Sequence, residues 1–310
     1  MSSTVGVVGG GRWGVALACA ARRAGRDVML WSRRRELDAE AQGAEQTDDF
    51  RALSKRCTLI LVAVPSDVVR DVARQLGDVI DGSHYVVHGI RGLSGEGLTP
   101  ISQVIREETP CRRVGALGGP GVAQDLIAGR PGVLAVASRF PEVTHAVRAA
   151  LEGPHVRVSI TPDITGLEWA SALNGCLLVA AGFGRAMGVS PGVLAGLLTR
   201  GIHEASRIGQ AAGGEPATSF SVAGIGDVMA ALAGDERPEV LLGMALGEGA
   251  TIEKARARAG LRVEAPTLVP RVVAFAKERR IDAPVFRTMA AAMAGTIQRE
   301  EILATLMTRG

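Results

Sequence analysis

The first half of the chain alternates short apolar runs with segments whose apolar residues recur at helical spacing. Strands that alternate with helices pair in parallel through crossover connections, and strands that are apolar throughout are buried on both faces of a sheet. This part of the chain therefore predicts a parallel sheet covered by helices. The expected strands are 5–8, 27–31, 57–64, 84–87, 114–117, 133–137 and 156–160, and the expected helices are 13–25, 66–76 and 141–152.

The pattern changes after Pro162. Long segments rich in Ala, Leu and Gly follow, and several begin with proline, which suits the first turn of a helix. We expect an α/β fold with a Rossmann-type doubly wound sheet at residues 1–160, followed by an all-helical C-terminal domain at residues 161–310 that serves substrate binding and dimerisation. The expected helices of this domain are 163–187, 191–212, 238–246, 251–259, 266–279 and a broken one at 284–308.

One segment of the second half combines an apolar composition with a polar pair. It begins at Glu168 and reads EWASALNGCLLVAAGFGRAMG, with Asn174 and Gly175 near its middle. Both residues lower helix propensity, and Asn-Gly is more common in turns. We expect a buried helix here, at the rim of a site and held together by packing.

Composition excludes several classes of function. The chain has 310 residues and a net charge of +3, which is too small to indicate a nucleic-acid partner. The four cysteines show no metal-ligand spacing and lie in or beside apolar runs, so we expect buried thiols in a reducing compartment and no metal site. The start of the chain carries no targeting pattern, and we expect a cytoplasmic protein without a membrane span.

The strongest motif is Gly9, Gly11 and Gly14 in the order G-x-G-x-x-G. It follows a predicted strand and opens a predicted helix, which is the context of a dinucleotide-binding turn. The first glycine permits the tight turn, the second lets a pyrophosphate approach the backbone, and the third lets helix and strand pack closely. We expect cofactor contacts from this turn, including Gly10, Arg12 and Trp13. The alternative is a tight turn without a ligand.

Two further corners are predicted to contact the cofactor. The second strand is followed by Ser32 and the arginines 33–35, where an NAD site would carry an acidic residue. A hydroxyl and guanidinium groups suit a 2′-phosphate, so Ser32 and Arg33 favour NADP over NAD. The alternative is a solvated basic turn. Pro65 lies at the carboxyl end of the third strand, on the ligand-binding rim, although a proline can also simply end a strand.

The chain resembles the NAD(P)-dependent glycerol-3-phosphate dehydrogenase family nearly from end to end. The resemblance implies a Rossmann domain, a helical substrate domain and reversible reduction of dihydroxyacetone phosphate. It also implies cofactor contacts at Ala123 and Glu264. The matching stretches include GGGRWGVALA, VPSDVV, HGIRGL, LGGPGVAQDLIAGRPGVLAVAS, ITGLEWASALNG, LLTRGIHEASRIGQAAGG, VAGIGDVMAAL and VEAPTLVPRVV.

The chain departs from the family pattern at the residues that carry the chemistry. Asn174 stands where the resemblance implies a lysine that acts as general acid, and His88 stands where it implies a second lysine. Asp227, which by resemblance orients the first lysine, is kept. The Arg-Asn pair that by resemblance holds the substrate phosphate is replaced by Pro238-Glu239, with Arg237 one place away and able to substitute if the loop shifts.

These departures leave three candidate catalytic residues. An amide has no titratable proton near neutral pH, so Asn174 can donate a hydrogen bond but no proton. A histidine side chain can act as an acid near neutral pH, so His88 can replace the lysine; the alternative is a strand-end histidine bonded to backbone. A buried Asp227 should find an arginine or water, and its alternative role is a helix N-cap. For Glu168, Glu204 and Glu264 we favour structural hydrogen bonding.

Three functions remain compatible with the sequence. The first is an NAD(P)H-dependent oxidoreductase that reduces dihydroxyacetone phosphate or a related hydroxy or keto substrate. The second is a catalytically degenerate dinucleotide-binding protein that acts as a sensor or partner subunit. The third is an enzyme of the hydroxyacid or opine dehydrogenase type. The expected partners are a small-molecule substrate, with a phosphorylated one among the alternatives, and a second copy in a homodimer.

Overall fold

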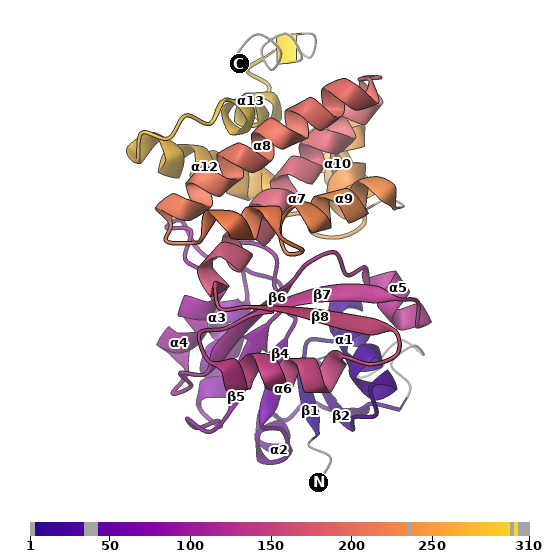
Figure 1. Ribbon diagram of the computed structural model, residues 1–310, viewed down its shortest axis with the longest axis vertical. Coiled ribbons are helices and arrows are strands. Elements are labelled where there is room, and N and C mark those ends of the chain that lie inside the picture. The colour runs from indigo at the N-terminus through magenta and orange to yellow at the C-terminus, as the bar shows by residue number, and fades with distance from the viewer. Residues whose placement is uncertain (1–3, 34–42, 235–236, 298–300, 303–310) are drawn as a thin grey trace. The chain divides into compact units, whose positions relative to one another are not determined.

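The structure is a computed structural model that describes residues 4–33, 43–234, 237–297 and 301–302 (Figure 1). The chain divides into two compact units. The first, called here the α/β unit, comprises Met1–Gly95 and Thr99–Glu168. The second, the helical unit, comprises Glu96–Leu98 and Trp169–Gly310.

An eight-stranded sheet forms the centre of the α/β unit, in the order β3-β2-β1-β4-β5-β6-β7-β8. The order reverses between β1 and β4, which is the switch point of a doubly wound sheet. The predicted apolar strands are confirmed, but the expectation of parallel pairing is wrong for β6 and β7, which are antiparallel. The strands are β1 (Val5–Val8), β2 (Val28–Trp31), β3 (Glu45–Thr47), β4 (Leu59–Val62), β5 (Tyr85–His88), β6 (Val114–Gly118), β7 (Gly132–Ala137) and β8 (Val156–Thr161).

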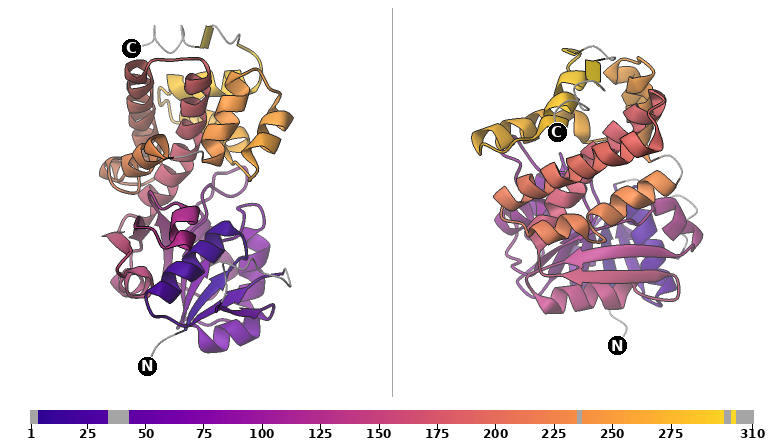
Figure 2. Two further views of the ribbon diagram at one scale, coloured as in Figure 1. Left: turned by 90° about the vertical axis from the view of Figure 1, so that its right-hand side faces the viewer. Right: turned by 45° about the horizontal axis from the view of Figure 1, so that its top comes forward.

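Helices cover both faces of this sheet (Figures 1 and 2). Successive strand residues point to opposite faces, so Val7 belongs to one hydrophobic cluster and Val8 to the other. Burial on both faces explains why these strands are apolar throughout. One face is covered by α1 (Arg12–Arg23), α5 (Ala123–Ala128) and α6 (Pro141–Leu151), and the other by α2 (Phe50–Arg56), α3 (Val69–Gly77) and α4 (Ile101–Glu108).

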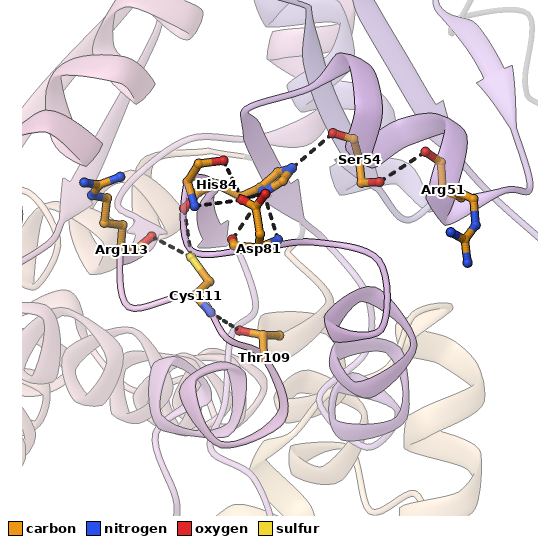
Figure 3. A network of polar contacts seen from close by, with 8 residues as sticks. Arg51, Ser54, Asp81, His84, Thr109, Cys111 and Arg113 are labelled. Atoms are coloured by element: carbon orange, nitrogen blue, oxygen red, sulfur yellow. Dashed lines mark hydrogen bonds and ion pairs between the residues drawn. The ribbon is translucent and has the colours of Figure 1, made fainter.

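A polar network lies at the amino ends of β5 and β6 (Figure 3). Nε2 of His84 is 3.0 Å from the Ser54 carbonyl oxygen, and its Nδ1 is 3.0 Å from Asp81 Oδ1. The Cys111 thiol donates to the His84 carbonyl at 2.8 Å. Ligands of open α/β sheets bind at the carboxyl ends of strands, so we interpret this network as structural.

The cysteines are free thiols. Cys57, Cys111 and Cys176 are buried, as expected, whereas Cys19 is half-buried. Burial raises the pKa of the Cys57 thiol to about 11 and also raises the pKa of Cys111. These two thiols therefore stay protonated at neutral pH.

The helical unit contains no strand among its described residues. Proline opens α8, α10 and α13 as predicted, whereas α9 was not expected. The long helix α7 (Ile164–Ala186) begins in the α/β unit and continues into the helical one. The other helices are α8 (Pro191–Ala211), α9 (Ile225–Ala233), α10 (Pro238–Gly247), α11 (Ile252–Ala259), α12 (Ala265–Glu278) and α13 (Pro284–Met293), with a short 3₁₀ helix at Pro216–Phe220.

Helix α7 runs unbroken through the Asn174-Gly175 pair. Gly182 in α7 and Gly243 in α10 allow the two helices to pack backbone against backbone. A Cβ added at Gly182 would lie 2.0 Å from the Val240 carbonyl oxygen, and one at Gly243 would lie 2.0 Å from the Val179 carbonyl oxygen.

Two helical stretches, Ile164–Ala186 and Pro216–Ala233, are long and apolar enough to cross a membrane, but 89% of the apolar window of the first is buried inside the structure. The expectation of a buried helix is therefore confirmed.

The buried carboxylate of Glu204 ties α8 to the start of α13. Its side chain accepts backbone N–H groups of Val285 at 2.9 Å and Phe286 at 3.2 Å. These donors belong to the first turn of α13 and have no partner inside their own helix. The favoured interpretation of Glu204 as a structural hydrogen-bonding group is confirmed. Burial raises the pKa of this carboxyl, and the two amide hydrogen bonds oppose part of that rise.

Substitution of Glu204 should alter both stability and its pH dependence. A raised native pKa adds stability that is fully present below the ordinary value of 4.5 and is lost as pH rises through the native pKa. The free energy of unfolding of the wild type, relative to Glu204→Gln, should therefore fall as pH rises from about 4. Glu204→Ala, which removes both acceptors, should lose about 2–3 kcal/mol at neutral pH. Urea denaturation from pH 4 to 7 measures this, and a wild type that tracks Glu204→Gln at every pH would contradict it.

Candidate functional site

The glycine turn connects β1 to α1 at the switch point of the sheet. Gly9 has φ +125°, a backbone conformation that disfavours any side chain. A Cβ added at Gly14 would lie 1.8 Å from the Gly9 carbonyl oxygen, whereas one at Gly11 would meet nothing within 4 Å. No side chain caps the start of α1 at Gly11. The turn thus combines two sterically required glycines with one that faces open space, beside the amide end of a helix.

Trp13 extends from this turn to the loops that follow β5 and β6. A Cβ added at Gly89 would lie 2.5 Å from the indole Nε1, and one at Gly121 would lie 3.5 Å from the ring. These two glycines were not among the predicted site residues. The sequence signal for Gly89 was a glycine directly after an apolar strand, whereas Gly121 stands in the loop beyond the end of β6. The lack of a side chain at Gly89 lets the indole lie along the carboxyl edge of the sheet, whereas a Cβ at Gly121 would clash with Leu134, at 2.4 Å.

The other predicted cofactor residues of the α/β unit fall at the same edge. Pro65 is exposed just beyond β4, and Ala123 is half-buried at the start of α5. Ser32 is 5% exposed, and its backbone N–H donates to the Thr47 carbonyl at 3.0 Å. Arg33 is exposed. The neighbouring arginines 34 and 35 lie outside the described residues.

His88 and Glu168 form a buried pair within the α/β unit. His88 ends β5, and its Nε2 is 3.0 Å from Glu168 Oε1, with both side chains 1% exposed. The Ile90 backbone N–H donates to Nδ1 of His88 at 3.4 Å, which leaves the ring proton on Nε2, beside the carboxylate. The structure therefore shows the backbone-bonded histidine that was the alternative interpretation.

Glu168 also holds the start of α4. It accepts the backbone N–H of Ser102 at 2.8 Å and the Ser102 hydroxyl at 2.7 Å. No other side chain caps this helix, whose N-cap is Pro100. Structural hydrogen bonding by Glu168 is thus confirmed. The partner Ser102 was not predicted, because nothing in the sequence marks it as lying beside the first turn of α7.

A second buried polar cluster lies within the helical unit. Asp227 is 1% exposed in the first turn of α9, and Arg237 Nη1 donates to its Oδ1 at 2.6 Å. The expectation that this carboxylate finds an arginine is confirmed. The alternative role of Asp227 as the N-cap is wrong, because Gly224 occupies that position. A Cβ at Gly224 would lie 2.1 Å from the Ser219 carbonyl oxygen, so only glycine fits there.

Asn174 supports the same helix start from α7. Its side chain is 3% exposed, and Nδ2 donates to the Gly224 carbonyl at 2.8 Å. The amide therefore pairs with backbone where the chain enters α9. This contact explains how a polar residue is accommodated in the middle of a buried helix.

Glu264 lies at the N-cap of α12 and forms an ion pair with Arg262 at 3.1 Å. Its backbone carbonyl also accepts the Thr267 hydroxyl at 3.0 Å. The structure thus places the predicted residues in two groups, with the glycine turn and His88 in the α/β unit and Asn174, Asp227 and Glu264 in the helical unit. Within the described residues there is no group of His, Cys, Asp and Glu that could hold a metal ion.

Known proteins match the chain along most of its length. A sequence profile for the N-terminus of NAD-dependent glycerol-3-phosphate dehydrogenase matches residues 4–46 and 41–144, and the profile for its C-terminus matches 163–304. The curated glycerol-3-phosphate dehydrogenase (NAD(P)+) of Thioalkalivibrio sulfidiphilus is 32% identical over 301 residues, which cover 91% of this chain and 90% of the relative. That of Brucella ovis is 29% identical over 329 residues, with 100% of this chain and 98% of the relative covered.

Solved structures share the fold. Glycerol-3-phosphate dehydrogenase from Coxiella burnetii superposes with a TM-score of 0.89 at 23% identity, over 99% of each chain. A ketopantoate reductase family protein from Ralstonia eutropha gives a TM-score of 0.59 at 16% identity, over 98% of this chain and 99% of its own. At these identities the likeness shows the arrangement of the elements alone.

The glycine turn allows a matched pair of substitutions. Gly11→Val should leave the melting temperature nearly unchanged, because a side chain there points into open space. It should weaken NADPH binding at least tenfold, since the side chain would occupy the approach to the helix amides. Gly14→Ala should instead destabilise the protein by about 3 kcal/mol through its clash with Gly9. Thermal denaturation and calorimetric titration separate the two, and wild-type affinity in Gly11→Val would contradict the proposed phosphate approach.

Proposed function

The chain belongs to the NAD-dependent glycerol-3-phosphate dehydrogenase family, and from this premise we propose that it is an NAD(P)H-dependent oxidoreductase that reduces dihydroxyacetone phosphate or a related hydroxy or keto substrate. The observation that carries the proposal is the glycine turn at the switch point of the sheet. The relatives from Thioalkalivibrio sulfidiphilus and Brucella ovis, which match this chain over 90% and 98% of their own length, are glycerol-3-phosphate dehydrogenases. The cytoplasm is the proposed location, in keeping with the free thiols.

The residues of the glycine turn fit a dinucleotide. Gly11 leaves room where a pyrophosphate would approach, and the adjacent amides of α1 carry partial positive charge. When bound, the nicotinamide supplies the hydride for carbonyl reduction. The chain's own contribution is to hold the phosphates at the turn, with Trp13 alongside them at the carboxyl edge of the sheet.

We propose NADP as the preferred form. Arg33 is exposed directly after β2, where a 2′-phosphate would be recognised, and Ser32 precedes it. A guanidinium presents planar donors that match phosphate oxygens. No carboxylate occupies either position to repel a phosphate.

We propose that His88, Asn174 and Asp227 serve the reaction, and the contacts define what each can do. Nε2 of His88 lies 3.0 Å from Glu168 Oε1, so this carboxylate is placed to orient the ring and to offset the charge of a proton taken up by it. The Asn174 amide is engaged with Gly224 and acts as a positioning group for α9. Asp227 carries the negative charge that fixes a cation, Arg237, in place. None of these three groups is a lysine-type acid.

A homodimer is the proposed assembly. The apolar stretch Pro216–Ala233 has only 39% of its apolar window buried, and Phe220 and Met229 on it are 45% and 62% exposed. Exposed apolar side chains of this size are typical of interaction surfaces. This part of the helical unit is therefore the surface that we propose for contact with a second copy.

Turnover should be measurable as NADPH oxidation in the presence of dihydroxyacetone phosphate. Without a lysine acid at position 174 the rate should be about 10²–10⁴-fold below that of a lysine-bearing relative assayed in parallel. A panel of small keto acids tests the related substrates. Cofactor binding without turnover on any of them would favour the non-catalytic sensor, and no binding of either nucleotide at millimolar concentration would contradict both functions.

Cofactor preference should depend on Arg33. Arg33→Ala should raise the Kd for NADPH about tenfold, because a charge-assisted hydrogen bond to the 2′-phosphate is worth about 1.5 kcal/mol or more. The Kd for NADH should stay unchanged. Arg51→Ala, at an exposed arginine of α2, is the control and should alter neither. Equal weakening for both nucleotides would show that Arg33 does not read the 2′-phosphate.

A further inference from the structure

A hollow of about 640 Å³ lies on the α/β unit, where the chain leaves α1 and where α6 ends and β8 begins (Figure 1). Its volume is within the range of about 300–1,000 Å³ that is typical of small-molecule sites. Three arginines line it, Arg26, Arg148 and Arg157, together with His145. Glu152 is the only carboxylate among its described lining residues, so the hollow is positively charged.

Each of the three guanidinium groups is held in place through part of its donors. Arg26 uses both Nε and Nη2 on one acceptor, the Ala149 carbonyl, at 3.1 and 2.9 Å. Arg148 Nε donates to Glu152 Oε2 at 2.8 Å, and Arg157 uses Nη1 on backbone carbonyls of the turn before β8. The part of the chain that the structure describes offers no hydrogen-bond partner to Nη1 of Arg26, to either Nη of Arg148 or to Nη2 of Arg157. A guanidinium has five N–H donors, so each group keeps donors for a ligand.

The alternative role of these arginines is to offset the negative ends of helices α1 and α6. That role accounts for the contacts with backbone carbonyls, but it does not require three guanidinium groups around one hollow. The Arg148 hydrogen bond lowers the pKa of Glu152, so this carboxylate stays ionised and offsets one of the three charges. Two positive charges remain in the lining without a carboxylate to balance them.

We propose that this hollow binds a diphosphate group, either as the free anion or as part of a nucleotide. A diphosphate carries more than one negative charge at neutral pH, which matches the charge left in the lining. Its oxygens lie on two phosphorus atoms, and the planar fork of an arginine can bind such oxygens in pairs. Charge complementarity and the size of the hollow therefore both favour this ligand.

The hollow is separate from the glycine turn, and the proposal goes beyond the oxidoreductase function without depending on it. The turn precedes Arg12, the first residue of α1, whereas Arg26 follows its last residue, Arg23. A helix of 12 residues is about 18 Å long, so one diphosphate cannot contact both ends of α1. The anion expected here is thus not the pyrophosphate of a dinucleotide bound at the turn.

A pair of substitutions at Ala149 tests the site by charge alone. Ala149 lines the hollow from α6, and its exposed position tolerates a longer side chain. In calorimetric titrations with inorganic diphosphate, Ala149→Glu should raise the Kd about tenfold or more by repulsion, whereas Ala149→Gln, of the same size, should stay within about twofold of the wild type. Gly11→Val, which blocks the approach to the glycine turn, should leave this Kd unchanged.

Removal of the arginines gives a second test. Arg148→Gln with Arg157→Gln should raise the Kd for diphosphate about tenfold or more, because charge-assisted hydrogen bonds are lost. Arg51→Gln with Arg112→Gln is the matched control, since it removes the same net charge from exposed arginines of the same unit and should change the Kd less than about twofold. Melting temperatures show whether the variants fold. If the first double variant unfolds, the Ala149 pair, which keeps every arginine contact, decides.

Titration with ADP in the Gly11→Val background distinguishes the two sources of the ligand. Tighter binding of ADP than of free diphosphate, lost in Ala149→Glu, would support the site and identify a nucleotide. Equal or weaker binding of ADP, with diphosphate binding lost in Ala149→Glu, would support the site and identify the free anion. Equal Kd values in the Ala149→Glu and Ala149→Gln variants, loss of diphosphate binding in Gly11→Val alone, or no binding at millimolar concentration would each overturn the proposal.

Discussion

The α/β unit depends on a single close approach, that of α1 to the end of β1. Gly14 passes so near the Gly9 carbonyl that no other residue fits, and Gly9 itself adopts a backbone conformation that disfavours side chains. Because these two positions carry no Cβ, the amide end of α1 lies directly on the carboxyl edge of the sheet. That edge is where the strand order reverses, so the same steric constraint fixes both the packing of the first crossover and the place where an anion can be bound.

Buried charge is the second constraint, and it is met differently in each of three places. Glu204 is satisfied by backbone amides of α13, Glu168 by Ser102, and Asp227 by a guanidinium. The first two arrangements cap helices and need no counter-ion. Asp227 instead has the guanidinium of Arg237 beside it, at 2.6 Å. A buried ion pair of this kind often adds no more stability than apolar side chains of the same size.

The sequence predicted most of the α/β unit because its strands are buried on both faces and therefore apolar at every position. It missed β3, whose three residues Glu45–Thr47 are polar, and α9, whose Ala- and Gly-rich segment follows a 3₁₀ turn. It also missed the short helices α2, α4 and α5, each of which has eight residues or fewer. It could not give the direction of β7, because an apolar run reads the same in either direction. The glycine turn was predictable since its three positions are close in sequence and each has a distinct steric role.

The partners of the buried polar residues were less predictable, because contacts across elements leave no spacing in the chain. That Asn174 meets Gly224, or Glu168 meets Ser102, follows only from how the helices pack. The contact of Arg237 with Asp227 was equally unpredictable, although the two residues are only 10 positions apart in the chain. Pro238 begins α10, so Arg237 is the N-cap residue of this helix and has an extended backbone. The side chain of Arg237 reaches Asp227 in α9. The contact between Arg237 and Asp227 thus depends on where α10 begins, which the spacing of residues along the chain does not reveal.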